Sequence, residues 1–515
     1  MAAPLGSGDD GIFEQLRRKQ GAKVLEEKAR AAEAEELARA EKAQRRLGDL
    51  ISSNSTLPCT ISNIHIIGAK HTRPGFLRGI FDPILSANQD HPYTLAEAIN
   101  EVSRGVSKLH KLDIYQQPIP LSITRPDPTN SSSTPTDIDI YLNLREKSRI
   151  LLKTGTDVGN AEGSAYVNAL GRNVFGGGET VNLNAALGTR TRSAYQASFD
   201  TPVLSNPDLR WESGGLASST QKPFASHEEV LKGGWTKLKW APEGGGAHEF
   251  AYNGVWRQVT SLAGGASPTI RADAGDSVKS SISHVWARDQ RDNPLLPTRG
   301  LFRKTLLELA GWGPLQGDVA FAKAEVEAQS ALPVPIPGVQ GETGVSFTTG
   351  LRAGLLYPLP LGLESESKPS RINDRFQLGG PTDVRGFRLS GLGPHDGSDA
   401  VGGDLYAAGS ANLLFPLPRV GIDRPFRLQA FVNGGRLLAL KRSSGKGNDS
   451  ENVKQAAVST VSELGNGLPS ISAGLGLIYA LPMARVELNF SLPLVLRKGE
   501  EGRKGLSFGI GINML

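Results

Sequence analysis

Few residues of this sequence are arranged for chemistry. Motifs for a phosphate-binding loop, for a serine nucleophile and for a zinc-type histidine pair are absent, and the 8 histidines are dispersed. The single cysteine, Cys59, excludes an intramolecular disulfide framework and a cysteine-based zinc cluster. The most distinctive polar motif, Val384-Arg385-Gly386-Phe387, ends the segment Leu378–Phe387. We therefore expect no enzyme, no metal site and no cofactor, and we look for binding instead.

Composition limits the classes of protein that remain. A chain of 515 residues is long for one soluble domain, and Gly 61 with Pro 32 indicates many turns. No stretch approaches the roughly 18 apolar residues of a membrane-spanning helix, so a membrane location would require a closed β-sheet. The formal net charge of +5 is scattered along the chain, which gives no support to nucleic-acid binding.

Two segments precede the main domain. Residues 1–55 are rich in Ala, Glu, Arg and Lys, which predicts a charged helix, either as an exposed arm or as a partner-binding helix. The acidic residues at the start argue against a cleavable targeting signal. Residues 56–147 predict a small α/β module with strands at 61–67, 114–123 and 138–144. A capping box at Thr94 and Glu97 predicts a helix that runs to about His110.

Residues 148–515 change to runs of about ten residues that alternate apolar and polar side chains, which is typical of a transmembrane β-barrel. In Arg485–Leu492, Val486, Leu488, Phe490 and Leu492 share one face. In Gly505–Met514, the alternating apolar residues likewise predict a lipid face and a polar lumen. A soluble β-sandwich is the alternative.

Counting such runs predicts about sixteen antiparallel strands, of which the run at 208–220 is the most polar. An even number returns both chain ends to the same side of the membrane. The predicted strands are 149–158, 161–170, 179–190, 193–202, 208–220, 229–241, 247–259, 278–290, 299–311, 317–331, 343–355, 403–416, 424–436, 467–480, 482–494 and 504–514.

An unusually long loop, about 357–402, follows the eleventh strand and contains Val384-Arg385-Gly386-Phe387. Here the chain resembles the bacterial surface antigen superfamily of outer-membrane assembly and translocation proteins, whose sixth outer loop folds into the lumen and ends in this motif. The resemblance implies that Arg385 is tied to an acidic residue on a neighbouring strand. Asn433 stands at the matching position of Phe431-Val432-Asn433-Gly434-Gly435, so we expect it to be the loop tether. Alternatively, Arg385 is simply solvated in the lumen.

Two further segments fit the resemblance. Arg288–Pro294, followed by Pro297-Thr298-Arg299-Gly300, resembles a hairpin of the superfamily, and we interpret it as structural. The last strand, with Ser507, Gly509, Ile512 and Met514, fits the mitochondrial β-signal, a strand prepared for edge pairing. Bacterial barrels of this kind usually end in an aromatic residue, and Leu515 stands here instead.

The module at 56–147 resembles a single polypeptide-transport-associated domain, and the whole region from Thr60 resembles the barrel subunits of the mitochondrial sorting and assembly machinery. The resemblance implies an integral protein of the mitochondrial outer membrane that inserts β-barrel precursors. The N-terminal domain and the C-terminus would face the intermembrane space. Partners would be β-barrel precursors, peripheral subunits of the complex and membrane lipid. The alternative is a protein-translocation channel of the same superfamily.

Insertion would proceed by strand pairing at a lateral gate between the first and last strands, since an unpaired sheet edge is costly in lipid. The residues expected to form this gate are Ile150, Leu152, Thr154, Thr156, Gly505, Ser507, Gly509, Ile512 and Met514.

Overall fold

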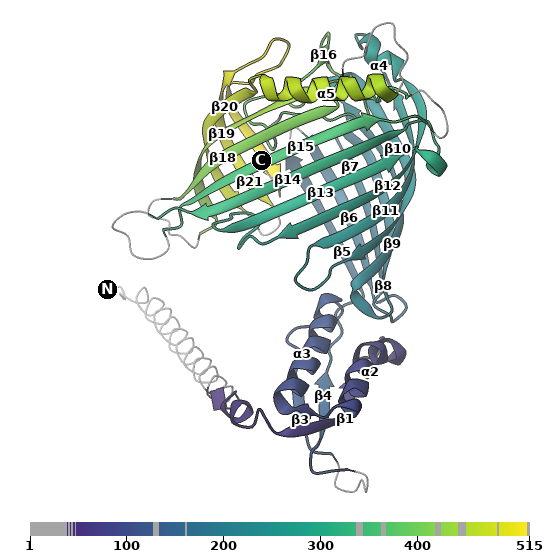
Figure 1. Cartoon of the computed structure of the whole chain (residues 1–515), viewed down its shortest axis with the longest axis vertical. Coiled ribbons are helices and arrows are strands. Elements are labelled where there is room, and N and C mark those ends of the chain that lie inside the picture. Colours follow the sequence, from purple (N-terminus) through teal and green to yellow (C-terminus); the bar gives the residue numbers. More distant parts are fainter. Residues whose placement is uncertain are drawn as a thin grey trace, which may run out of the picture. The chain divides into compact units, whose positions relative to one another are not determined.

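The chain divides into two compact units in a computed structural model (Figure 1). One unit holds the residues up to Lys70 together with Leu77–Glu146, and the other holds His71–Phe76 and Lys147–Leu515. Most of the predicted charged arm lies outside the described residues, although 48–53 are helical. The structure describes residues 39, 42, 45, 46 and 48–511, with gaps at 127–132, 160–161, 336–342, 362–366, 418–423, 441–449 and 482–483.

The smaller unit is a four-stranded sheet with two helices. Its strand order is β2-β1-β4-β3, and only β1 and β4 run parallel. Among the described residues, no helix is both long and apolar enough to cross a membrane. The elements are β1 (Pro58–Ile67), α2 (Pro74–Asp90), β2 (Tyr93–Thr94), α3 (Leu95–Lys111), β3 (Leu121–Thr124) and β4 (Asp137–Asn143).

The capping box predicted at the start of α3 is present. The Thr94 side chain accepts from the Glu97 N–H, and the Glu97 carboxylate accepts from the Thr94 N–H at 2.9 Å. These bonds satisfy two donors that the first helical turn leaves without partners. The Thr94 hydrogen bonds hold the pKa of the exposed Glu97 carboxyl below its usual range. Ala98 and Val102 are fully buried on the inner face of the helix.

One prediction for this unit is wrong, and one helix was missed. The second strand occupies only Leu121–Thr124 rather than 114–123, because Pro118 and Pro120 have no N–H for a ladder. The helix α2 was not predicted, and it contains Pro83, a residue that usually interrupts a helix.

The larger unit is a single sheet of sixteen strands, β5 to β15 and β18 to β22, in which each strand pairs with the next in sequence. The prediction of about sixteen strands is confirmed, including the polar run that forms β9. The first eleven strands are β5 (Ile150–Gly159), β6 (Glu162–Arg172), β7 (Thr180–Gly188), β8 (Thr191–Val203), β9 (Asn206–Lys222), β10 (His227–Trp240), β11 (Ala247–Thr260), β12 (Gly275–Asp289), β13 (Gly300–Ala310), β14 (Phe321–Pro333) and β15 (Ser346–Pro358). The last five are β18 (Leu405–Pro416), β19 (Phe426–Leu438), β20 (Ser470–Ala480), β21 (Arg485–Val495) and β22 (Gly505–Gly511).

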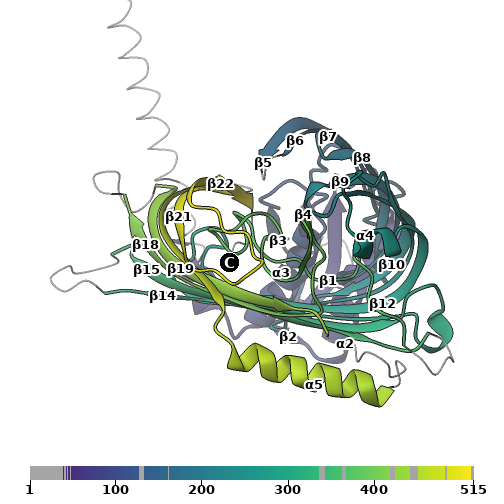
Figure 2. The same cartoon turned by 90° about the horizontal axis from the view of Figure 1, so that it is seen from above.

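Side-chain exposure along the strands follows the predicted alternation. On β21, Leu488 and Phe490 are each 45% exposed, whereas Glu487 and Asn489 are fully buried. The sheet therefore has an apolar outer face and a polar inner face, as a barrel in lipid requires. One continuous sheet curls around the lumen, which excludes two packed sheets of a sandwich (Figure 2).

The segment between β12 and β13 is a hydrogen-bonded turn, as predicted. The Asp292 carboxylate accepts from the N–H groups of Thr298 at 3.0 Å and Arg299 at 3.2 Å, and from the Thr298 hydroxyl at 2.5 Å. Gly300 has φ +113°, a backbone conformation that side chains disfavour. These contacts stabilise the turn, so the role of this segment is structural.

Candidate functional site

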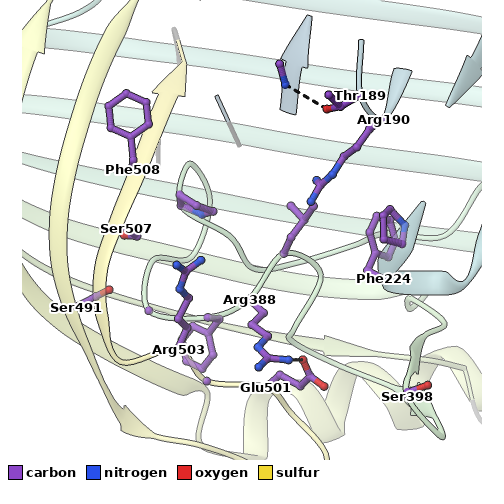
Figure 3. A pocket seen from close by; sticks show the side chains of 17 residues that line it. Thr189, Arg190, Phe224, Arg388, Ser398, Ser491, Glu501, Arg503, Ser507 and Phe508 are labelled. Carbon is purple, nitrogen blue, oxygen red and sulfur yellow. Dashed lines mark hydrogen bonds and ion pairs between the residues drawn. The ribbon is translucent and has the colours of Figure 1, made fainter. Parts of the chain in front are cut away.

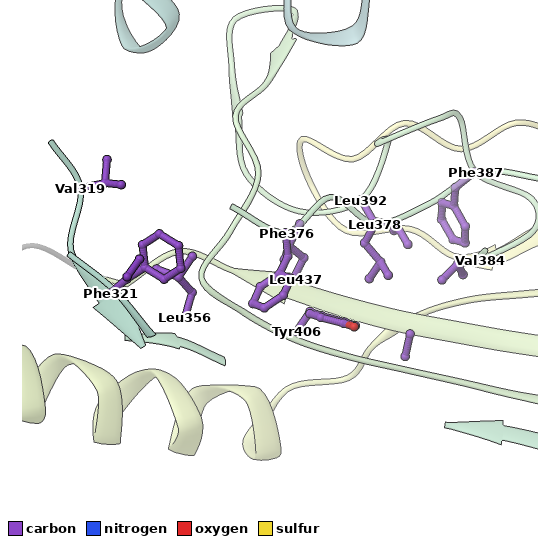
Figure 4. Close-up of a cluster of buried hydrophobic side chains, with 12 residues drawn as sticks. Val319, Phe321, Leu356, Phe376, Leu378, Val384, Phe387, Leu392, Tyr406 and Leu437 are labelled. Atoms are coloured by element: carbon purple, nitrogen blue, oxygen red, sulfur yellow. The ribbon is translucent and has the colours of Figure 1, made fainter. Parts of the chain in front are cut away.

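The connection between β15 and β18, here called loop 6 (359–404), folds back against the inner face of the wall. It carries a short hairpin whose two strands, β16 (His395–Asp396) and β17 (Asp399–Ala400), have two residues each. Its apolar residues pack onto inward-facing side chains of β14, β15, β18 and β19 (Figure 4). This buried cluster comprises Ala310, Val319, Phe321, Leu356, Phe376, Leu378, Val384, Phe387, Leu392, Tyr406, Ala408 and Leu437.

The guanidinium of Arg385, at the tip of loop 6, is completely buried and binds the equally buried carboxylate of Glu487 on β21. Nε donates at 2.9 Å to one carboxylate oxygen, and Nη2 donates at 3.2 Å to the other. Glu487 also pairs with Arg485 at 2.5 Å and accepts from Asn489 at 2.8 Å and Gln429 at 3.2 Å. Two guanidiniums thus share one carboxylate, so each charge is compensated only while Glu487 stays ionised.

The expected tether, Asn433, does not bind this guanidinium. Its side-chain amide, oriented to complement its neighbours, binds the main chain of Arg385 instead. The amide oxygen of Asn433 accepts from the Arg385 N–H at 2.9 Å, and the amide nitrogen donates to the Arg385 carbonyl at 3.2 Å. The hydroxyl of Ser472 also donates to the Arg385 carbonyl. Asn433 therefore positions the backbone of the loop tip. The main chain of Arg385 lies against β19, whereas its side chain extends to β21, where Glu487 is its acidic partner.

The other residues of the motif fit the same place on the wall. Gly386 has φ +86°, and a Cβ there would lie 2.7 Å from the Cβ of Ser472, so this close approach requires glycine. Val384 is fully buried and Phe387 is 2% exposed. Phe387 also forms a bridge with Gly502, in the connection between β21 and β22. All four residues therefore hold the tip against the last strands of the barrel.

A second ion pair fixes the start of loop 6 to a different part of the wall. Arg257 on β11 donates to both carboxylate oxygens of Asp374, at 2.5 and 3.1 Å. The side chains are 4% and 2% exposed. The composition of the sequence gave no signal for this pair, because neither residue stands in a motif.

The hairpin of loop 6 is fixed to the same side of the barrel. Asp399 accepts from the N–H of Ser267 at 2.7 Å, just before the short helix α4 (Pro268–Ala272). Asp396 accepts from the hydroxyl and the N–H of Thr269, at 2.7 and 3.1 Å, and these bonds lower the pKa of its carboxyl. Loop 6 is therefore held at its start, its hairpin and its tip.

A cavity of about 1190 Å³ lies between the tip of loop 6 and the strands at the two edges of the sheet (Figure 3). Its wall includes Ser507 and Phe508 from β22 and, across the cavity, Gly163 and Thr189 from the ends of β6 and β7. The charged residues of its lining are Arg190, Arg388 and Arg503 and one carboxylate, Glu501. Glu501 forms an ion pair with Arg388 at 3.1 Å. The charged groups of the lining thus carry an excess of positive charge, beside apolar side chains such as Phe224 and Phe508.

The edge strands β5 and β22 come into contact, but among the described residues no ladder joins them. Ile150 and Leu152 are 77% and 64% exposed. The predicted gate residues Thr154, Thr156, Gly505, Ser507 and Gly509 lie along these two edges, whereas Ile512 and Met514 lie outside the described residues.

The glycine of the predicted β-signal contacts loop 6. A Cβ at Gly509 would lie 3.3 Å from the carbonyl oxygen of Pro381 and from the methyl group of Thr382. The last strand therefore approaches the loop closely on its inner face, while the edge of its described residues that faces β5 has no ladder. Within the described part of the chain, no group of three or more His, Cys, Asp or Glu is arranged to hold a metal ion.

A sixteen-stranded barrel with an inward-folded loop, tied at its tip by a buried arginine, defines an outer-membrane β-barrel of the assembly and translocation class. Residues 173–514 match the Omp85 superfamily domain, and the chain belongs to this superfamily.

Two relatives extend the match beyond the barrel. The chain is 39% identical over 478 residues to the SAM50-like protein of Schizosaccharomyces pombe, covering 92% of this chain and 95% of the relative. It is 30% identical over 460 residues to the sorting and assembly machinery component 50 homolog of Mus musculus, covering 88% and 90%. BamA from Haemophilus ducreyi lacking POTRA domains 1–3 has the same fold, with a TM-score of 0.66, 15% identity and coverage of 88% and 84%.

Proposed function

We propose that this protein is an insertase that folds β-barrel precursors into the mitochondrial outer membrane as the barrel subunit of a sorting and assembly complex. The observation that carries the proposal is the seam, where the described residues of β5 and β22 meet without a ladder in an otherwise continuously paired sheet. Membership of the Omp85 superfamily and the similarity to sorting and assembly machinery proteins support it.

The mechanism needs no chemical step, and we propose that the protein is not an enzyme. Backbone N–H and C=O groups along an unpaired edge are costly in lipid, because no water is present to bind them. A precursor strand that pairs with β22 or β5 satisfies these groups, so the free energy of insertion comes from folding of the precursor. Loop 6 stays fastened to the inner wall and supports the last strands during this exchange.

The residues proposed to form the gate are those on the two edges. Ile150, Leu152, Thr154 and Thr156 alternate on β5, and they would face lipid or an entering strand. Opposite them, Gly505, Ser507 and Gly509 belong to β22, and the β-signal continues to Ile512 and Met514.

A translocation channel of the same superfamily is the second candidate, and the cavity of about 1190 Å³ beside loop 6 favours it. A polypeptide that crosses the membrane would contact polar lumenal side chains such as Asn182, which binds Asn168 at 2.8 Å inside the barrel. A polypeptide that is inserted would contact the seam instead. The two functions therefore differ in which side chains meet the client.

Disulfide trapping in isolated membranes tests the proposal. Thr154→Cys, in a Cys59→Ala background, is combined with cysteines along the C-terminal strand of a radiolabelled barrel precursor. We expect crosslinks in one register, set by the β-signal of the precursor. Val326→Cys is the matched control, since Val326 is 47% exposed on the same lipid-facing side but belongs to β14, which is paired on both edges. Crosslinks only to Asn182→Cys would favour the channel.

Sidedness and partners are part of the proposal. Sixteen strands return the chain to the side on which it entered, so the N-terminal unit and the C-terminus would both face the intermembrane space. Peripheral subunits would then bind the opposite, cytosolic rim, and lipid would cover the outer wall. Protease protection of epitopes at the two ends in intact mitochondria tests the orientation, because both epitopes should resist added protease until the outer membrane is ruptured.

A further inference from the structure

The helix α5 (Ser450–Asn466) belongs to the connection between β19 and β20 and lies outside the barrel. It packs against β18 and β19, and both views place it on the outer side of the wall near the rim that carries loop 6 (Figures 1 and 2). A helix at this place borders the band of side chains that faces lipid. The exposed side chains of α5 therefore determine how this part of the wall contacts the membrane.

An outward-facing arginine of β19 holds the helix in place. Arg436 follows the alternation of Leu428 and Val432, which are 37% and 50% exposed, yet it is only 4% exposed itself. Its guanidinium donates to the main-chain carbonyls of Glu463 and Leu464 and lies 3.6 Å from the Glu463 carboxylate. A cation at the C-terminal end of a helix complements the carbonyls left without partners there.

The residue after the helix makes room for this contact. A Cβ at Gly467 would lie 2.1 Å from Nη1 of Arg436, so a side chain at position 467 would have to displace the guanidinium from its place at the last turn of α5. Thr460 is 1% exposed, which shows that the middle of the helix is packed as well. The position of α5 on the outer wall is thus fixed from Thr460 to its C-terminal end.

The exposed half of α5 is divided into two stripes. With successive residues about 100° apart, Val458, Val461 and Gly465 form an apolar stripe along the C-terminal half of α5 on one side of the packed face, and the exposed Lys454 lies on the same side one turn before this stripe begins. The valines are 70% and 50% exposed, and Leu468, just beyond the helix, is 78% exposed. On the other side lies a stripe that is entirely polar and comprises Gln455, Ser459, Ser462 and Asn466.

The direction of the helix decides where each stripe faces. In Figure 1, α5 runs from right to left and ends towards β20, with the wall behind it. A right-handed helix advances clockwise when seen from its N-terminus. The stripe of Val458 and Val461 is therefore turned towards the middle of the barrel wall, and the polar stripe is turned towards the rim.

We infer that α5 is an interfacial helix that lies in the headgroup region of the bilayer, with its apolar stripe among the acyl chains and its polar stripe in water. The stripe continues the lipid-facing band formed by Leu428 and Val432 of β19 and by Leu475 of β20, which is 66% exposed. An amphipathic helix at this depth is the arrangement that such a division of side chains favours. The occupant of the apolar stripe is lipid.

Because Arg436 and Asn433 belong to the same strand, α5 and the tip of loop 6 hold opposite faces of β19. The helix therefore ties the strand that carries Asn433 to the membrane surface. This places a lipid contact directly behind the site inside the barrel.

The test compares two residues at about equal angles from the packed face, Val461 and Ser459. Each is replaced by cysteine in full-length Cys59→Ala protein, labelled with an environment-sensitive fluorophore and reconstituted into phosphatidylcholine–phosphatidylethanolamine vesicles. We expect a lipid carrying a quencher near the headgroup to quench the label at 461 several-fold more than the label at 459. Iodide in the buffer should show the opposite order.

Equal quenching of both labels by iodide, with none by the lipid quencher, would place the helix in water and overturn the inference. Protection of the label at 461 from both quenchers would show that protein covers the stripe, which also overturns it. Both side chains lie outside the packed face and are exposed, so neither substitution disturbs the packing, and heat-modified mobility of the barrel in detergent gels confirms folding of each variant.

Discussion

Replacing Glu487 by Gln removes one negative charge from a cluster in which two guanidiniums depend on it. Arg385 is completely buried and the side chain of Arg485 is 10% exposed, and both bind this carboxylate. Removing one partner of a buried ion pair typically costs about 3–5 kcal/mol. Since about 1.4 kcal/mol corresponds to a factor of ten, the docked state of the loop tip should weaken on the order of 10²- to 10⁴-fold.

Hydrogen exchange of the full-length protein in detergent or nanodiscs measures this effect. The amides of 384–387 should exchange faster in the Glu487→Gln variant by a factor in that range, provided that the tip opens locally before the barrel unfolds. Precursor insertion by the reconstituted variant should fall together with protection. The main chain of Arg385 also binds Asn433, so Asn433→Ala should accelerate the same amides by a smaller factor.

Arg388→Ala is the matched control, because Arg388 belongs to the same loop and forms an ion pair with Glu501. The side chains of this pair are 65% and 44% exposed, so its loss should cost at most about 1 kcal/mol. The reasoning holds that the buried ion pairs of Glu487 keep the loop tip docked. It would be refuted if the protection of the 384–387 amides from exchange were unchanged in Glu487→Gln, or if it fell equally in Arg388→Ala.

Three further predictions follow from other contacts. Arg257→Ala leaves the buried Asp374 without its cation, so exchange at the start of loop 6 should rise, whereas exchange at 384–387 should change little. Thr94→Ala removes the cap of α3 and should destabilise that helix by about 1 kcal/mol, read from exchange of its first-turn amides. Burial, followed by the charge of Glu97, raises the pKa of the Cys59 thiol, so alkylation of the folded protein should reach half its maximal rate at a higher pH than that of the unfolded chain. The stability gained by keeping this thiol neutral is complete below its unfolded pKa and is lost as the pH rises through the folded pKa; a thiol that titrates alike in both states would contradict the assignment.

The sequence predicted the barrel well because alternation is a local property. On β21, Arg485, Glu487 and Asn489 recur at every second position, so their place on the inner face follows from the geometry of a strand. The same reasoning found β9, although its sequence is polar, because one lumenal face and many small residues suffice for a barrel strand. It failed for α2, whose Pro83 weakens the helical pattern that packing nevertheless stabilises.

The sequence by itself thus determined the class of fold, the number of strands, the facing of their side chains and the motif Val384-Arg385-Gly386-Phe387 at the tip of a long loop. Only the tertiary structure decided that Arg385 binds Glu487, because the choice between Glu487 and Asn433 depends on how far a side chain reaches across three strands. The pair of Arg257 and Asp374 is 117 residues apart in sequence, and such a contact leaves no periodic trace. Periodicity reports which face a residue occupies, whereas the partner it meets there is set by the curvature and register of the sheet.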